Sequence, residues 1–134
     1  MGLRLSAISI LATVALACSV SVQSFARPEP GQIVFGTGHD STFTMVSGPA
    51  NTFKQEGDFE FVGIFPHHVT GMVRMEVVKN DEPVRRAGSF TFATPGNYWW
   101  GAWHLSDFPG PGHYLLRMTL DSESLAVGEF DLTP

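Results

Sequence analysis

Apolar and polar side chains alternate along most of the chain after residue 31, and this period of two predicts β-strands. Val73, Met75 and Val77 fall on one face of such a segment, whereas Arg74 and Glu76 fall on the other. No segment after residue 31 has the apolar spacing of a helix. The expected strands are residues 32–35, 42–47, 58–65, 72–78, 89–93, 98–104, 113–120 and 125–132.

Turn-forming residues separate these segments. Asparagine, aspartate, proline and glycine occur at residues 80–83, 94–97 and 109–112, and they supply the backbone conformations that turns need. About seven to nine short strands, with turns roughly every eight to twelve residues, are typical of an antiparallel sandwich or small barrel. We therefore predict an all-β fold. A parallel α/β sheet is excluded because no segment could form the crossover helix.

The last third of the chain resembles a known fold family. Residues 110–117 read Gly-Pro-Gly-His-Tyr-Leu-Leu-Arg, and residues 128–132 read Gly-Glu-Phe-Asp-Leu. These segments resemble the last two strands of bacterial immunoglobulin-like and fibronectin type III-like domains. In that family a glycine turn precedes a tyrosine whose hydroxyl bonds back to the backbone. The resemblance implies an immunoglobulin-like β-sandwich of about seven to nine strands and no particular activity.

The first 26 residues have the pattern of a signal peptide. Arg4 supplies a positive start, residues 5–16 are mostly apolar, and Ser24-Phe25-Ala26 offers the small residues that a signal peptidase reads. We expect a signal helix over residues 1–26, a linker at 27–31 and one domain over 32–134. The mature protein would then be exported, to the periplasm or the cell exterior.

Cys18, the only cysteine, leaves a second possibility open. It follows Ala15-Leu16-Ala17, which resembles the lipobox of bacterial lipoproteins, although that family has leucine where this chain has Ala15. A lipid on Cys18 would anchor the domain to a membrane. The same three residues also form an ordinary cleavage site. If Cys18 is removed with the signal, the mature chain has no thiol and no disulfide.

The charge balance argues against nucleic acid as a partner. The whole chain has eight basic and thirteen acidic residues, a formal net charge of −5, and without Arg4 the mature domain would be near −6 (seven minus thirteen). Such a surface repels phosphate backbones. Arg85 and Arg86 form the only basic pair, which is too little to attract a polyanion.

We predict no catalytic residues. The sequence has no Gly-x-Ser-x-Gly motif for a nucleophilic serine. Glu56, Asp58 and Glu60 are close together, but we interpret them as a solvated strand face, because glycosidases need two carboxylates that face each other across a cleft. The sequence therefore indicates a protein that is not an enzyme and that needs no cofactor.

A metal site is the alternative function. His67 and His68 lie in one loop, and Met72 follows four residues after His68. Imidazole and thioether groups are ligands for copper, so these three residues predict a periplasmic copper-binding protein under this alternative. Met75 is expected in the core, on the opposite face from Met72.

The aromatic segment at residues 98–103 is the leading candidate for a binding site. Alternation places Trp99 and Trp103 on one face of the strand and Tyr98 and Trp100 on the other. One face fills the core, so the other either displays its rings or lies beneath a loop such as residues 105–111. Displayed rings typically indicate an interface. Tyr98, Trp99, Trp100 and Trp103 therefore predict a binding module with a protein or glycan partner of the cell envelope.

Overall fold

The computed structural model describes residues 24–80 and 82–134. The predicted signal helix up to residue 23, including Cys18, lies outside the described residues. Within them the fold is all-β, as predicted, and its one short helical turn is the 3-10 element η1 (Leu105–Asp107). No helix among these residues is long and apolar enough to cross a membrane. The strands are β1 (Phe25–Ala26), β2 (Ile33–Gly36), β3 (Gly38–His39), β4 (Val46–Ser47), β5 (Thr52–Lys54), β6 (Asp58–Lys79), β7 (Glu82–His104), β8 (Gly112–Leu120) and β9 (Glu123–Thr133).

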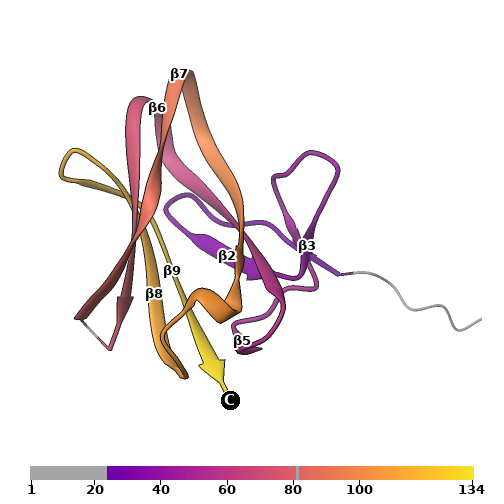
Figure 1. Ribbon diagram of the computed structural model, residues 1–134. Coiled ribbons are helices and arrows are strands. Elements are labelled where there is room, and N and C mark those ends of the chain that lie inside the picture. Colours follow the sequence, from indigo (N-terminus) through magenta and orange to yellow (C-terminus); the bar gives the residue numbers. More distant parts are fainter. Residues whose placement is uncertain (1–23, 81) are drawn as a thin grey trace, which may run out of the picture.

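A long bent hairpin, formed by β6 and β7, runs through the whole fold and connects its layers (Figure 1). The first part of β6 pairs with β2, and its last part pairs with β8, both in antiparallel register. Strand β9 pairs with β8, and β5 adds to β9 in parallel. The hairpin therefore belongs to a layer of β2, β6 and β7 at one end and to a layer of β5, β9, β8, β6 and β7 at the other.

The hairpin bends at two regions where the sequence predicted that a strand would end. We predicted separate strands at 58–65 and 72–78 and a break at 94–97, but β6 and β7 continue through these regions. The pairing register shifts between Ile64 and Val69 and again between Val69 and Gly71. Bulges of this kind bend a strand without ending it. Gly71 assists because its φ of 105° is unfavourable for residues with a side chain.

Both layers face one aromatic core. Phe59 lies at its centre, fully buried, with ring contacts to Phe35, Phe61 and Phe130 among others. The predicted alternation is confirmed, since the inward residues of both halves of β6 are buried. They are Phe59, Phe61, Phe65, Val73, Met75 and Val77.

A second, smaller sheet of order β1–β4–β3 packs beside the first layer. Phe25 pairs with Ser47 and Ala26 with Val46, so the β-structure begins upstream of residue 32. The segment that we expected to be a linker also takes part, because the Gly31 N–H donates to the Ile64 carbonyl. The expected strand at 42–47 is shorter than predicted: only Val46–Ser47 is extended, and a side-chain-capped turn precedes it.

The start of β8 contains the tyrosine that motivated the family resemblance. The Tyr114 hydroxyl donates a hydrogen bond to the Gly110 carbonyl at 2.6 Å. Its ring is fully buried, and burial raises the pKa of the hydroxyl. This bond ties the turn before β8 to the strand itself.

Candidate functional site

The aromatic segment of β7 divides between two faces, as its alternation predicted. Trp99 stacks on Phe90 with ring centroids 3.7 Å apart and planes 6° apart. Trp103 packs on Phe61 at 4.8 Å. Both indoles therefore pack against the core and remain only partly exposed. Tyr98, which is 42% exposed, lies on the opposite, outer face together with the half-buried Trp100.

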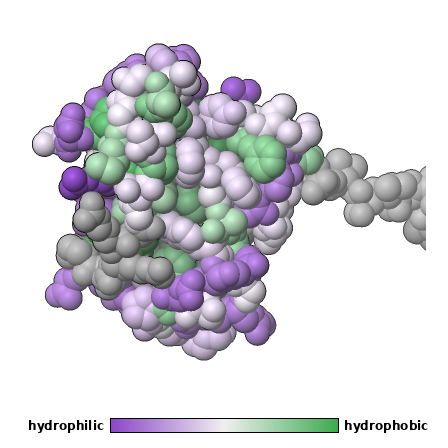
Figure 2. All heavy atoms as spheres, turned by 45° about the horizontal axis from the view of Figure 1, so that its top comes forward, coloured by the Kyte–Doolittle hydropathy of each residue, from purple (hydrophilic) through white to green (hydrophobic). Residues whose placement is uncertain are grey.

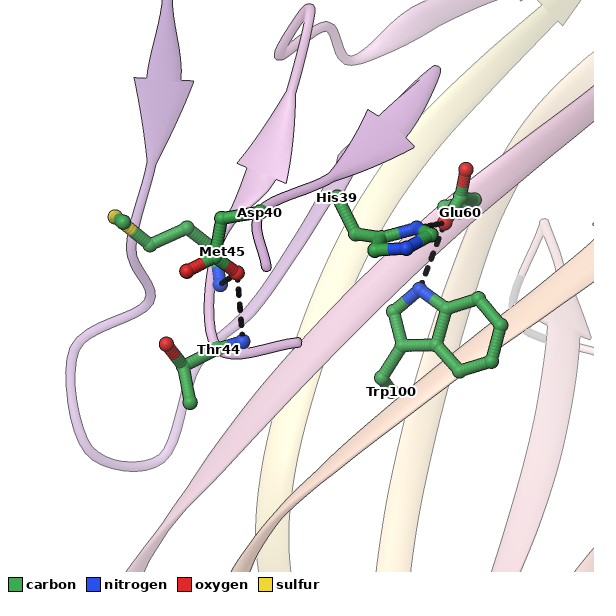
Figure 3. Close-up of polar contacts among 6 residues, drawn as sticks. All are labelled: His39, Asp40, Thr44, Met45, Glu60 and Trp100. Atoms are coloured by element: carbon green, nitrogen blue, oxygen red, sulfur yellow. Dashed lines mark hydrogen bonds and ion pairs between the residues drawn. The ribbon is translucent and has the colours of Figure 1, made fainter. Parts of the chain in front are cut away.

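Trp100 is fixed by a carboxylate on the neighbouring strand (Figure 3). Its indole N–H donates to Glu60 Oε1 at 2.7 Å, and His39 Nδ1 lies 2.6 Å from the same oxygen. The Glu60 side chain is only 16% exposed, so this carboxylate works as a partly buried acceptor. Charged acceptors form stronger hydrogen bonds than neutral ones. The orientation of Trp100 is therefore set by three strands, β3, β6 and β7.

Phe43 is a functional candidate that sequence reasoning missed. It is 40% exposed, and its φ of 59° places it in the left-handed region, where a residue with a large side chain is uncommon. Its ring stacks on His39 at 4.2 Å and meets the Trp100 indole edge-on at 5.0 Å. The sequence pattern assigned residues 42–47 to a strand, and it carried no hint of this contact. We call Phe43, Tyr98 and Trp100, with His39 and Glu60, the outer aromatic cluster.

Asp40 holds the turn that presents Phe43. Its carboxylate accepts a bond from the Thr42 hydroxyl at 2.5 Å. It also accepts bonds from the N–H groups of Thr44 and Met45 at 2.9 and 3.0 Å (Figure 3). These bonds, led by that of Thr42, lower the pKa of Asp40 to about 2. The turn is therefore ordered by its own side chains, and the position of Phe43 is built into it.

Other exposed hydrophobic side chains lie apart from the cluster. Figure 2 brings the bend of the hairpin forward and shows hydrophobic areas separated by hydrophilic residues. Among the side chains that the structure describes, Phe25 and Met72 are the other large exposed hydrophobic residues, at 44% and 46%. A hollow of about 560 Å³ lies between β2 and β9, and no member of the outer aromatic cluster lines it.

The three residues of the metal alternative have different surroundings. His67 Nε2 lies 2.5 Å from Glu123 Oε1, His68 is exposed, and Met72 lines a different hollow with Thr70 and Leu120. Within residues 24–80 and 82–134, no group of three or more His, Cys, Asp or Glu side chains is arranged to hold a metal ion.

Two further histidine–carboxylate pairs lie on the surface. His104 pairs with Asp58 across β6 and β7, and His113 Nδ1 lies 2.7 Å from Asp131 Oδ1 across β8 and β9. The hydrogen bond that each imidazole donates to its carboxylate partner raises the pKa of His67, His104 and His113 above the usual value. The carboxylates of the predicted acidic face thus serve mainly as cross-strand partners: Asp58 for His104, and Glu60 for Trp100 and His39.

These pairs predict that the folded protein becomes less stable as the pH rises through neutrality. A pKa that is raised on folding means that the folded protein binds the proton more tightly than the unfolded chain does. The three pairs stabilise the fold in full below the pKa of an unfolded histidine, which is about 6.5. This stabilisation is lost as the pH rises through the raised pKa of the folded protein. We expect the melting temperature to fall between about pH 6 and pH 8, and less steeply in a His67→Gln, His104→Gln, His113→Gln variant. A wild-type melting temperature that rises over this range would contradict the assignment.

Comparison with known proteins gives no relative that bears on this site. No family model matches the chain, and no curated protein matches it either.

Proposed function

We propose that this protein is an exported, non-catalytic binding module with an immunoglobulin-like sandwich. Two observations support the family. Antiparallel layers on both sides of one core are connected through the bent hairpin, and the Tyr114–Gly110 hydrogen bond has the form of the tyrosine corner at the start of the penultimate strand.

The outer aromatic cluster is the proposed recognition surface. The observation that carries the proposal is that Phe43, which is 40% exposed, packs on a Trp100 indole held by Glu60, while Tyr98, which is 42% exposed, projects from the same outer face of β7 as Trp100. Tyr98 and Trp100 are two residues apart in one strand, so both side chains project from the same face. Rings held in place lose little freedom on binding, and their remaining apolar area is available to stabilise a complex.

A protein partner in the cell envelope fits this surface better than a glycan. Trp100 meets Phe43 edge-on and not as a flat platform, and the hollow of about 560 Å³ lies elsewhere. Small ligands generally need a concave site with convergent polar groups, whereas protein interfaces are rich in Tyr, Trp and Phe. The net charge of −5 opposes a nucleic-acid partner.

The test compares capture of envelope proteins and retention on immobilised glycans by the exported protein and its variants. Trp100→Ala and Tyr98→Ala should each weaken capture by about tenfold or more, because aromatic residues at an interface often contribute 1.4 kcal/mol or above. Met72→Ala is the matched control, since Met72 is equally exposed but lies outside the cluster. Equal losses in all three variants, or no loss in any, would refute the proposed surface. Glycan retention that depends on Trp100 would identify a sugar ligand instead.

Export itself is tested by the mass of the mature chain. Cleavage after Ala26 would remove β1, which pairs with β4, whereas cleavage after Ala17 would keep it and leave Cys18 at the N-terminus. A lipid on Cys18 would add a further mass and place the module on a membrane. A chain that keeps Met1 and stays inside the cell would contradict export.

A further inference from the structure

Strand β7 has a free edge along its aromatic end. Among the strands of the described residues, β7 pairs with β6 and with no other strand (Figure 1). A free edge exposes unpaired N–H and C=O groups, and proteins usually guard such edges with prolines or charged side chains. The first part of β7 contains Pro83, Arg85, Arg86 and Pro95, whereas residues 98–103 contain neither proline nor charge. The unguarded part of the edge is therefore the aromatic part.

The backbone direction of this edge follows from the neighbouring pairing. The Ile64 N–H donates to Gln32 and the Ile64 carbonyl accepts from Gly31, so the backbone groups of Ile64 point towards the β2 side of β6. Groups alternate along a strand, and hence Phe61 and Gly63 point towards β7. Their partners there are Gly101 and Trp99. The N–H and C=O groups of the residues between these partners point to the free side of β7. These residues are Tyr98, Trp100 and Ala102.

The sequence of this edge is complementary to itself. An antiparallel pairing of two copies, centred on Gly101, sets Trp100 of each copy opposite Ala102 of the other, so a large side chain faces a small one. Both residues have backbone groups on the free side, as hydrogen-bonded partners require. Gly101 meets Gly101 at the two-fold axis, where strands approach most closely. No side chain fits at this position even in one chain, because a Cβ on Gly101 would lie 2.4 Å from Phe61.

We propose that two copies of this chain associate through residues 98–104 of β7. The contact joins the two β2–β6–β7 layers into one continuous sheet with a two-fold axis. The partly exposed rims of Trp99 and Trp103 face each other across it and become buried. It also sets two outer aromatic clusters side by side on one face, which makes the assembly bivalent. One strand from each copy forms a small interface, so the dimer is weak and depends on concentration.

The experiment is sedimentation velocity of the purified exported protein over a concentration series, with two substitutions at one position. Ala102→Pro removes an N–H on the free side of β7 while leaving the pairing with β6 in place, and prolines are tolerated at such edge positions. Ala102→Ser keeps this N–H and a small side chain. We expect the wild type and Ala102→Ser to dimerise alike, and Ala102→Pro to raise the dissociation constant by about tenfold or more.

Hydrogen exchange of the wild type gives a second readout that needs no variant. Protection of the amides in residues 98–104 should increase with protein concentration, whereas protection in residues 82–92, on the guarded part of β7, should not. A wild type that stays monomeric to millimolar concentration would overturn the proposal. So would a dimer that Ala102→Pro leaves unchanged, or protection that does not depend on concentration.

Discussion

Phe59→Ala is expected to lower the free energy of unfolding by about 3–5 kcal/mol, because it removes a fully buried ring from the centre of the core. Phe59 has aromatic neighbours on every side, from both layers and from the loop after β7. Its ring contacts are Phe35, Phe53, Phe61, Trp103, Phe108 and Phe130. The loss is a large part of the total stability of a small domain, which is about 5–15 kcal/mol.

Urea unfolding followed by tryptophan fluorescence measures this loss. Phe59→Leu fills more of the cavity and should cost less than Phe59→Ala. Met72→Ala is the surface control, since Met72 is 46% exposed and lies well outside the predicted signal peptide, and it should change the stability by no more than about 0.5 kcal/mol. A Phe59→Ala variant as stable as the Met72→Ala variant would mean that the two layers do not share this core.

Gly128→Ala is expected to destabilise the contact between β2 and β9 by about 1–3 kcal/mol. A Cβ on Gly128 would lie 2.5 Å from the Ile33 carbonyl oxygen and 2.8 Å from the Ile33 Cβ. The nearest obstacle is a backbone oxygen, and neither it nor the Ile33 Cβ can rotate away as the end of a flexible side chain can. Alanine also reduces the entropy of the unfolded chain, which favours folding by about 0.4–1 kcal/mol, but the clash outweighs this gain.

The local consequence can be measured as hydrogen exchange. The Val127 N–H donates to the Gly31 carbonyl at 3.1 Å, and its protection should decrease in Gly128→Ala. Ser124→Ala, an exposed substitution in the same strand, should leave both the stability and this protection unchanged. A Gly128→Ala variant that is as stable as wild type would contradict the close approach of β2 to β9.

Local patterns predicted the strands and their faces well. Alternation in residues 72–78 assigned Val73, Met75 and Val77 to the core, and all three are buried. The same rule separated Trp99 from Trp100, which lie on opposite faces of β7. Side-chain direction in a strand depends on neighbouring residues only, so the sequence suffices to predict it.

The parts that were missed depend on contacts between distant residues. Turn-forming residues at 94–97 predicted the end of a strand, but pairing with the bulged part of β6 keeps β7 continuous. Phe43 and His39 come near Trp100 only because the small sheet packs beside β6, and neither segment shows this in its own sequence. The acceptor Glu60 was interpreted as solvated, whereas it is a partner of both Trp100 and His39.

Site-specific photo-crosslinking in the native envelope tests the central claim most directly. A photoreactive phenylalanine analogue replaces Phe43, Tyr98 or Met72, three side chains of similar exposure. If the outer aromatic cluster is the recognition surface, positions 43 and 98 give the same adduct with a second protein, Trp100→Ala removes it, and position 72 gives none. Equal labelling at all three positions, or adducts from position 72 alone, would contradict the account.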